Sequence, residues 1–330
     1  MRSLLTGVAV AAAMALGATA AQAQKLTMRI SHQVPPAHHL SKMLEIFAAE
    51  AKQRSNGQID VQLLGASSAF KPAENHPAVA RGAIEAALSV SFQWGNTIPE
   101  MSVVVIPYLF SEIERIRKFP GSDAAKILER KLEEKGVKNL AWLYITRQAI
   151  YTSGRKPLIA LQDFKGVKIR GLNPMADEAL RAVGAAPSAM PGDEVYQALQ
   201  TGVLDAGMTD VSAAFSRKYY EVQKYGTVTP ALTVYFHLYV NPRWWSSLSP
   251  AHRAALEAAA RKAEAEAVPI TEKTAEEAVL RLRERGMVVH VHSAQEAAAW
   301  RNVMQKPVID AFLKAAPQDG PKLIEALNRL

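Results

Sequence analysis

Apolar and polar positions alternate in the first part of the chain in a way that predicts a β-α-β unit. Residues 25–31 and 59–63 place an apolar side chain at every second position, which is typical of strands. Between them, apolar residues at helical spacing run from Leu40 to Ala51 and stop at Asn56-Gly57. A strand, a helix and a strand in this order predict a parallel sheet.

The same patterns predict the later elements. Further strands are expected at residues 84–89, 140–144, 234–240 and 288–292, and helices at residues 74–81, 122–135, 294–312 and 322–330. From Pro250 to Gly286 the chain is rich in Ala, Glu and Arg, and Pro269 is the main break in the pattern. Two alternatives remain open there, namely one long helix bent at Pro269 or two helices, the second starting at Pro269.

The segment from Asp163 to Asp210 is predicted to form a strand, two helices and a strand. The first strand spans residues 167–170 between two glycines, a helix begins at Pro174, a second covers residues 193–199, and residues 203–208 form the last strand. Arg170 therefore lies where a strand gives way to a loop. In open α/β sheets ligands bind at such an edge, although an arginine there can also be a plain surface residue.

Composition and charge narrow the classes of function. The chain has 330 residues, enough for one large or two medium hydrophobic cores. Its composition, with 49% hydrophobic and 21% charged residues, excludes global disorder. The net charge of +8 is spread along the chain without an aromatic–basic motif, so we expect a solvated surface that favours anionic ligands and no nucleic-acid partner. The absence of cysteine excludes disulfides, thiolate catalysis and cysteine metal sites.

The N-terminus has the pattern of a secretory signal peptide. Arg2 precedes an apolar run from Leu4 to Leu16, and Ala21-Gln22-Ala23 has the form of an A-x-A cleavage site. We expect a signal peptide at residues 1–23 and a periplasmic mature protein that begins at Gln24. The alternative is a retained membrane anchor, which the short apolar run disfavours.

Motifs of catalysis and of metal binding are absent from the sequence. There is no G-x-S-x-G, no P-loop and no H-E-x-x-H, and the S-x-x-K at Ser153–Lys156 precedes a proline in a turn and not a helix. His290 and His292 lie on one side of a predicted strand, but no third ligand lies near in sequence. We therefore expect no catalytic residues, no metal site and no cofactor.

Three segments together resemble a known family. The runs DFKGVKIRGLNP, VGAAPSAMP and EVYQALQTGVLDAG are similar to the signature of the periplasmic solute-binding proteins of TRAP transporters, the DctP type, and SNGQIDVQLLG and KYYEVQKY extend the resemblance over roughly residues 25–320. It implies an α/β, two-lobed periplasmic-binding-protein fold (type II-like) with a long helix along both lobes. The implied lobes are residues 25–144 with about 235–274, and residues 145–234 with about 275–330.

The resemblance also implies a mechanism. A monomer would bind an organic acid between the lobes, close by a hinge motion, and deliver the ligand to the membrane permease subunits of a TRAP transporter. Such a protein is a receptor and not an enzyme. Two alternatives are a binding protein for another importer or a sensor kinase, and a secreted hydrolase or lyase, for which no nucleophile or acid–base pair is found.

The residues expected to bind the ligand follow from the same resemblance. Arg170 would hold the carboxylate, and Arg147 would lie near the ligand. Phe92 and Trp94 follow a strand end that faces the cleft in this fold. The other candidates are Thr209, Asn173, His32 and Glu74.

Departures from the family pattern predict a less polar cleft. Thr209 stands where the family has an asparagine that touches ligand, Gly192 replaces an aromatic residue, and Val90 stands where sialic-acid receptors carry an acid. We therefore expect an apolar or aromatic monocarboxylate, such as a 2-oxo or 2-hydroxy acid.

Overall fold

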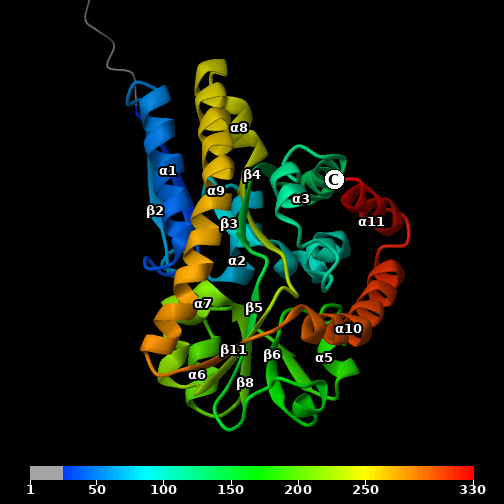
Figure 1. Ribbon diagram of the computed structural model, residues 1–330. Helices are drawn as coiled ribbons and strands as arrows, with labels where there is room; N and C mark the ends of the chain where they lie inside the picture. The colour runs from blue at the N-terminus through cyan, green and yellow to red at the C-terminus, as the bar shows by residue number, and fades with distance from the viewer. Residues whose placement is uncertain (1–24) are drawn as a thin grey trace, which may run out of the picture.

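The computed structural model describes residues 25–330, which fold around two β-sheets (Figure 1). The strands are β1 Leu26–His32, β2 Ile59–Leu64, β3 Ala86–Val90, β4 Lys138–Thr146, β5 Ala149–Ser153, β6 Lys168–Gly171, β7 Ala186–Ala189, β8 Ala206–Asp210, β9 Tyr225–Thr229, β10 Val234–Val240 and β11 Val288–Val291. The signal peptide predicted for residues 1–23 lies outside the described residues.

Helices cover both sheets. The α-helices are α1 His39–Arg54, α2 Pro72–Arg81, α3 Ile113–Lys118, α4 Asp123–Glu134, α5 Glu178–Ala182, α6 Val195–Gln200, α7 Val211–Ser216, α8 Pro242–Ser247, α9 Pro250–Glu284, α10 Ala294–Ala315 and α11 Gly320–Asn328. Short 3-10 turns are η1 Ser91–Asn96, η2 Pro99–Val105, η3 Leu161–Phe164 and η4 Tyr219–Glu221. None of the described helices is long and apolar enough to cross a membrane.

The first sheet has the strand order β2-β1-β3-β10-β4. Strand β1 pairs in parallel with β2 and β3, which confirms the parallel β-α-β unit predicted for the start of the chain. Strand β10 inserts antiparallel between β3 and β4. All seven residues of β10 are buried, and this strand has a paired neighbour on each side.

The second sheet has the order β11-β9-β5-β8-β6-β7 and contains three strands that the sequence pattern did not predict. These are β5, β7 and β9. In the segment from Asp163 to Asp210 the observed order is therefore β6, α5, β7, α6 and β8, and the predicted helix at Pro174 begins later, at Glu178. Strand β7 (APSA) has one proline and three small residues, which explains why its pattern gave no strand signal.

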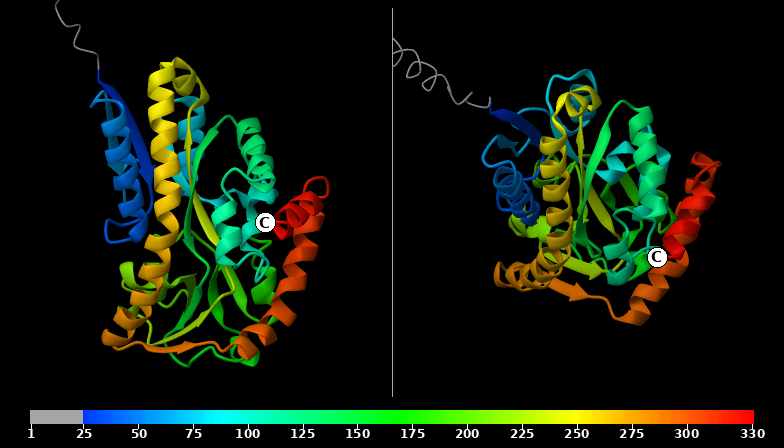
Figure 2. Two further views of the ribbon diagram at one scale, coloured as in Figure 1. Left: turned by 45° about the horizontal axis from the view of Figure 1, so that its top comes forward. Right: turned by 90° about the horizontal axis from the view of Figure 1, so that it is seen from above.

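Three segments cross between the two sheets. Strand β4 runs into β5 through residues 147–148, β9 returns to β10 through residues 230–233, and α9 packs against α1 and β4 at one end and α7 and β11 at the other. Helix α9 continues through Pro269 over 35 residues, so the alternative of one long helix is correct and that of two helices is wrong. Figure 2 shows α9 running the length of the molecule.

The C-terminal helices lie on the side of the molecule opposite α1 (Figure 2). Helix α10 packs on α5 and η2, and α11 packs on α4 and η2. The chain therefore returns from the second sheet to the helices of the first, although the sequence-based division placed residues 275–330 with the second lobe. Which residues move together on closure stays a prediction.

Candidate functional site

The guanidinium of Arg170 is buried between strands of the second sheet. It extends from β6, where its Nη1 donates to the Met208 carbonyl of β8 at 2.7 Å, and its Nε and Nη2 donate to the Met190 carbonyl just after β7 at 3.3 and 3.2 Å. One carbonyl thus comes from β8 and the other directly follows β7, the two strands on either side of β6. The residue is only 4% exposed, so the idea of a plain surface arginine does not describe it.

Arg170 has no carboxylate partner within ion-pair distance among residues 25–330. Burial lowers its pKa, and the nearby charge of Arg217 acts in the same direction, whereas Asp210 and Asp177 act against it from a distance. A guanidinium has five N–H donors, and backbone carbonyls take up three of them. The arrangement holds a positive charge out of water without an acid beside it, which is the electrostatic condition for binding an anion.

The chain next to Arg170 is fixed by Asp177. Its Oδ1 accepts a hydrogen bond from the Leu172 N–H at 2.7 Å, immediately after the end of β6. A Cβ on Gly171 would lie 2.2 Å from Oδ2 of the same carboxylate, so only glycine allows this approach. Burial raises the pKa of Asp177 to about 6. The glycine that marked the strand end in the sequence is therefore needed for packing and not only for the turn.

A cavity of about 30 Å³ lies beside Arg170, between the two sheets. Residues of both sheets and their loops line it: Gln33, His38, Val90, Phe92, Ile145, Arg170, Leu172, Gly192, Thr209, Asp210, Arg217, Leu232, Val234 and Phe236. Its volume is close to the share of one water molecule in the liquid, roughly 30 Å³. An organic acid can enter only if the walls move apart.

Larger cavities adjoin this central cavity on two sides. One of about 340 Å³ shares Phe92 and Leu172 with it and is also lined by Trp94, Asn173 and Met190. Another of about 470 Å³ shares Gln33, Gly192 and Arg217. The cleft between the sheets is therefore nearly closed at Arg170 and wider at both flanks.

Arg217 is a second cation in the central cavity that sequence reasoning missed. It follows α7, and a Cβ on Gly192 would lie 2.3 Å from its Nη1, so the missing side chain at Gly192 leaves room for this guanidinium. Its Nε is buried and has no hydrogen-bond partner within the described part of the chain. The signal was present in the sequence, because Gly192 replaces an aromatic residue of the family pattern.

Asp210 and His38 face each other across the central cavity. Oδ1 of Asp210 caps α7 by accepting the Ala213 N–H at 2.7 Å, and Oδ2 lies 3.9 Å from Nε2 of His38. Nδ1 of His38 accepts the Leu40 N–H, so in the neutral ring the proton is on Nε2. Burial raises the pKa of Asp210, but the neighbouring histidines outweigh it and lower this pKa to about 2. The carboxylate is therefore ionised.

The predicted site residues are only partly brought together. Phe92 and Thr209 line the central cavity with Arg170, and the guanidinium carbon lies 6.0 Å from the centre of the Phe92 ring. Trp94 and Asn173 line the adjoining 340 Å³ cavity. Asn173 also joins the two halves of the cleft, because its Nδ2 donates to the Phe92 carbonyl at 2.9 Å and to Oγ of Ser102 at 3.0 Å.

Arg147, His32 and Glu74 line none of these three cavities. Arg147 pairs with Glu272 of α9 at 2.7 Å, where β4 crosses into β5. His32 is buried against Gly65, and burial lowers its pKa to about 4. Glu74 lies in the first turn of α2, where it accepts the Lys71 N–H. In this arrangement all three side chains contact other parts of the protein and not the cavities around Arg170.

Comparison with known proteins shows to which family the chain belongs. Residues 30–315 match the model of the DctP family, described as bacterial extracellular solute-binding protein, family 7. The C4-dicarboxylate-binding periplasmic protein DctP of Rhodobacter capsulatus is 32% identical over 311 residues, which cover 93% of this chain and 92% of that protein.

Solved structures show the same fold. A TRAP periplasmic solute-binding protein from Desulfovibrio salexigens with bound orotic acid superposes with a TM-score of 0.87 at 26% identity, covering 92% of this chain and 98% of the other. An extracytoplasmic solute receptor of Bordetella pertussis that binds pyroglutamic acid gives 0.84 at 25% identity, covering 92% and 99%. The two-lobed fold predicted from the sequence is confirmed.

Proposed function

The chain belongs to the DctP family of bacterial extracellular solute-binding proteins, and from this premise we propose that it is a TRAP-transporter receptor for one small monocarboxylate with an apolar or aromatic body, such as a 2-oxo or 2-hydroxy acid. The observation that carries the proposal is the buried guanidinium of Arg170 beside the central cavity, with no acid at ion-pair distance in residues 25–330. A carboxylate matches its fork with two parallel N–H···O bonds.

The charge of the central cavity favours one carboxylate over two. The guanidiniums of Arg170 and Arg217 and the carboxylate of Asp210 give its lining a formal charge of +1, leaving out of the count His38, whose Nε2 lies 3.9 Å from Oδ2 of Asp210. One carboxylate neutralises this charge, and a second would leave a buried negative charge without a partner, which is costly. Arg217 can donate instead to the uncharged oxygen of a 2-oxo or 2-hydroxy group.

The adjoining cavity suits an apolar body. Its volume of about 340 Å³ falls within the range of small-molecule sites, and Phe92 connects it to the central cavity. Phe92, Trp94 and Met190 supply apolar walls. A ligand with its carboxylate at Arg170 could therefore extend over the ring of Phe92.

The relatives point to two ligand classes. Orotic and pyroglutamic acid, bound by the two receptors with solved structures, are cyclic acids with one carboxylate each. The Rhodobacter capsulatus relative is named for C4-dicarboxylates, and Arg217 as a second cation is the observation that would favour such a ligand here. We place the monocarboxylate first because of the cavity charge and the apolar flank.

A thermal-shift panel followed by calorimetry tests the proposal. The panel contains 4-methyl-2-oxopentanoate, phenylpyruvate, benzoate, orotate and pyroglutamate against succinate, malate and glucuronate. A ligand at 100 times its Kd should stabilise the protein by about 2.7 kcal/mol. Tight binding of a C4-dicarboxylate or a sugar acid, with none of the monocarboxylates, would overturn the proposed ligand class and leave the receptor function intact.

Closure of the cleft is the second part of the proposal. The moving units are residues 25–144 with about 235–274, and residues 145–234 with about 275–330. Contacts across the cleft support a closed form: Asn173 bonds to Phe92 and Ser102, and Oγ of Ser67 donates to Oδ2 of Asp193 at 2.7 Å. Small-angle scattering should show compaction on ligand addition, as hinge motion requires. An unchanged radius of gyration would contradict closure.

Delivery and export complete the proposal. The receptor works as a periplasmic monomer without a cofactor, after removal of residues 1–23, and its partners are the permease subunits of a TRAP transporter. N-terminal sequencing of the exported protein should find Gln24 first. Ligand-dependent binding to those subunits in proteoliposomes would support this role. It would distinguish the protein from a binding protein of another importer or of a sensor kinase.

A further inference from the structure

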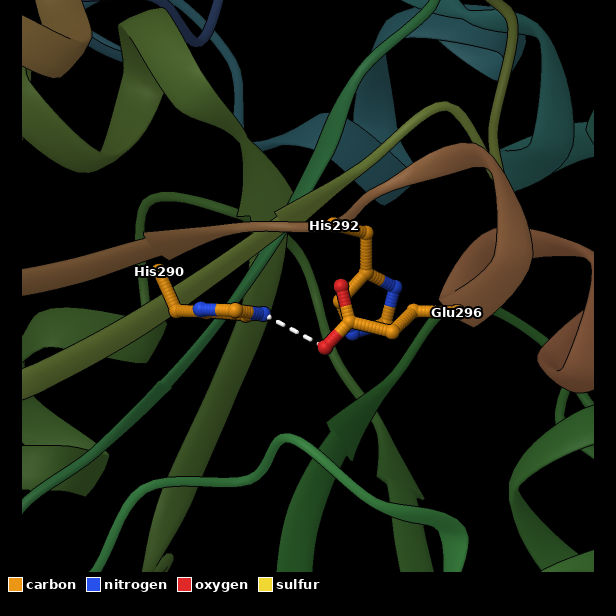
Figure 3. Close-up of side chains that lie close together, drawn as sticks. All are labelled: His290, His292 and Glu296. Carbon is orange, nitrogen blue, oxygen red and sulfur yellow. Dashed lines mark hydrogen bonds and ion pairs between the residues drawn. The ribbon is translucent and has the colours of Figure 1, made fainter.

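A cluster of two histidines and one glutamate lies at the junction of β11 and α10, away from the cleft. His290 extends from β11, His292 directly follows this strand, and Glu296 comes from the first turn of α10 (Figure 3). A ring nitrogen of each histidine and a carboxylate oxygen of Glu296 all lie within 4.8 Å of one another. Glu296 follows His292 by only four residues, so the expectation that no third ligand lies near in sequence was wrong.

Hydrogen bonds hold the carboxylate with one oxygen directed toward the histidines. Oε2 of Glu296 accepts the N–H of Ser293 at 2.7 Å and its Oγ–H at 2.9 Å, whereas Oε1 lies 2.9 Å from Nε2 of His290. Partners of this kind orient carboxylates that bind metals.

His292 is held in place by packing. It is 9% exposed, and its ring packs edge-on against Trp300 with centroids 4.5 Å apart. Nε2 lies 3.3 Å from the Ile159 carbonyl, and the buried Nδ1 has no hydrogen-bond partner among the residues described. A neutral imidazole with one N–H bonded to a carbonyl keeps one lone pair for an ion.

We propose that His290, His292 and Glu296 form a binding site for one transition-metal dication such as Zn²⁺, completed by water. Two imidazole nitrogens and one carboxylate oxygen suit Zn²⁺, Ni²⁺ or Co²⁺ better than Mg²⁺ or Ca²⁺. Bonds of about 2.0–2.2 Å place tetrahedral ligand atoms roughly 3.4 Å apart. His290 and Glu296 are each about one-third exposed in their side chains, so both can adjust to this spacing.

The ion would join the first turn of α10 to an edge strand. In the second sheet β11 pairs only with β9, and it carries the chain from α9 to α10. None of the three ligand residues lines the cavities around Arg170, so the site is separate from solute binding. We expect the metal to stabilise this junction without being required for solute binding.

Titration of untagged mature protein, freed of metal by chelator, tests the site. Zn²⁺ competition with a chromophoric chelator should give one equivalent bound, and Co²⁺ should give the visible absorption of a four-coordinate complex. His290→Ala and Glu296→Gln should each weaken Zn²⁺ binding at least about 10-fold, as losses around a metal do. Affinity should also fall on acidification, because protons compete for the ligands.

His252→Ala is the matched control, because His252 is a histidine outside the cluster, bonded to Gln58. It should leave Zn²⁺ binding unchanged. Circular dichroism checks that each variant is folded, and the partly exposed His290 is preferred over His292, whose removal would disturb the packing of Trp300. A parent protein that binds no Zn²⁺, or a His290→Ala variant whose affinity stays within threefold of the parent, would overturn the proposal.

Discussion

Replacement of Arg170 by alanine should abolish most of the solute affinity. The guanidinium is 4% exposed, so its pair with a carboxylate would be fully desolvated once the ligand is bound. Loss of one partner of such a pair costs on the order of 2–5 kcal/mol. At 1.4 kcal/mol per decade this predicts a loss of about 30- to 4,000-fold in affinity.

The effect on folding should be smaller, because two contributions oppose each other. The carbonyls of Met190 and Met208 lose their donors, at a cost of about 1–3 kcal/mol each. The same substitution removes a buried cation that has no acid at ion-pair distance in the described chain, and burying such a charge costs several kcal/mol. We therefore expect the free energy of unfolding of the ligand-free protein to change by less than about 2 kcal/mol.

Calorimetry with the best ligand of the panel measures the loss of affinity, and urea denaturation without ligand measures the change in stability. Arg170→Lys is the companion variant, because it restores the charge without the planar fork and should recover only part of the affinity. If folded Arg170→Ala binds the ligand within threefold of the parent, Arg170 does not hold the carboxylate. Arg217 would then be the next candidate.

Three further predictions concern the cleft and its surroundings. Arg217→Gln should weaken binding of a 2-oxo acid by about 10- to 100-fold, and binding of the analogue without the 2-oxo group much less. If calorimetry shows the same loss of affinity for both ligands, Arg217 does not bind the 2-oxo group. Asn173→Ala removes two hydrogen bonds across the cleft, which makes the closed form less stable, and should therefore weaken binding by about 5- to 150-fold. An unchanged affinity would count against this closed form. His237, whose pKa burial lowers to about 3, stays neutral when folded and is protonated below about 6.5 when unfolded, so it destabilises the fold as pH falls. In urea denaturation, the free energy of unfolding of His237→Phe should therefore fall by about 3 kcal/mol less than that of the parent when the pH is lowered from 7 to 4.

The sequence predicted the elements that have strong periodicity. Strand β10 was predicted with its observed bounds, and α4 within one residue, because a long run of β-branched and aromatic residues marks a buried strand and an amphipathic helix repeats its pattern over several turns. The segment of α9 was recognised within two residues from its Ala, Glu and Arg content, which left one helix or two open. Strands β5, β7 and β9 were missed. They have four or five residues and are buried or flanked by glycine and proline, so too few positions remain for alternation to show.

The candidate site was predictable where backbone position determines it and not where packing does. Arg170 follows from its place at the end of β6. Arg217 lies 47 positions later in the chain, and it reaches the same cavity only because Gly192 has no side chain. Arg147 matched a family pattern, but Glu272, 125 residues away, is its partner. Contacts of this range depend on the assembled sheets, and no local pattern encodes them.

The buried charge of Arg170 also explains why ligand and closure should be coupled. In the absence of ligand, closing the cleft removes water from a guanidinium whose hydrogen-bond partners among residues 25–330 are two backbone carbonyls, and this desolvation opposes closure. A bound carboxylate offsets the cost and at the same time fills the space between the two sheets. The ligand then favours the closed form by its differential affinity for it, which is the requirement for a ligand-driven change of conformation. A receptor that closes only around its acid presents the closed shape to a permease only when it carries cargo.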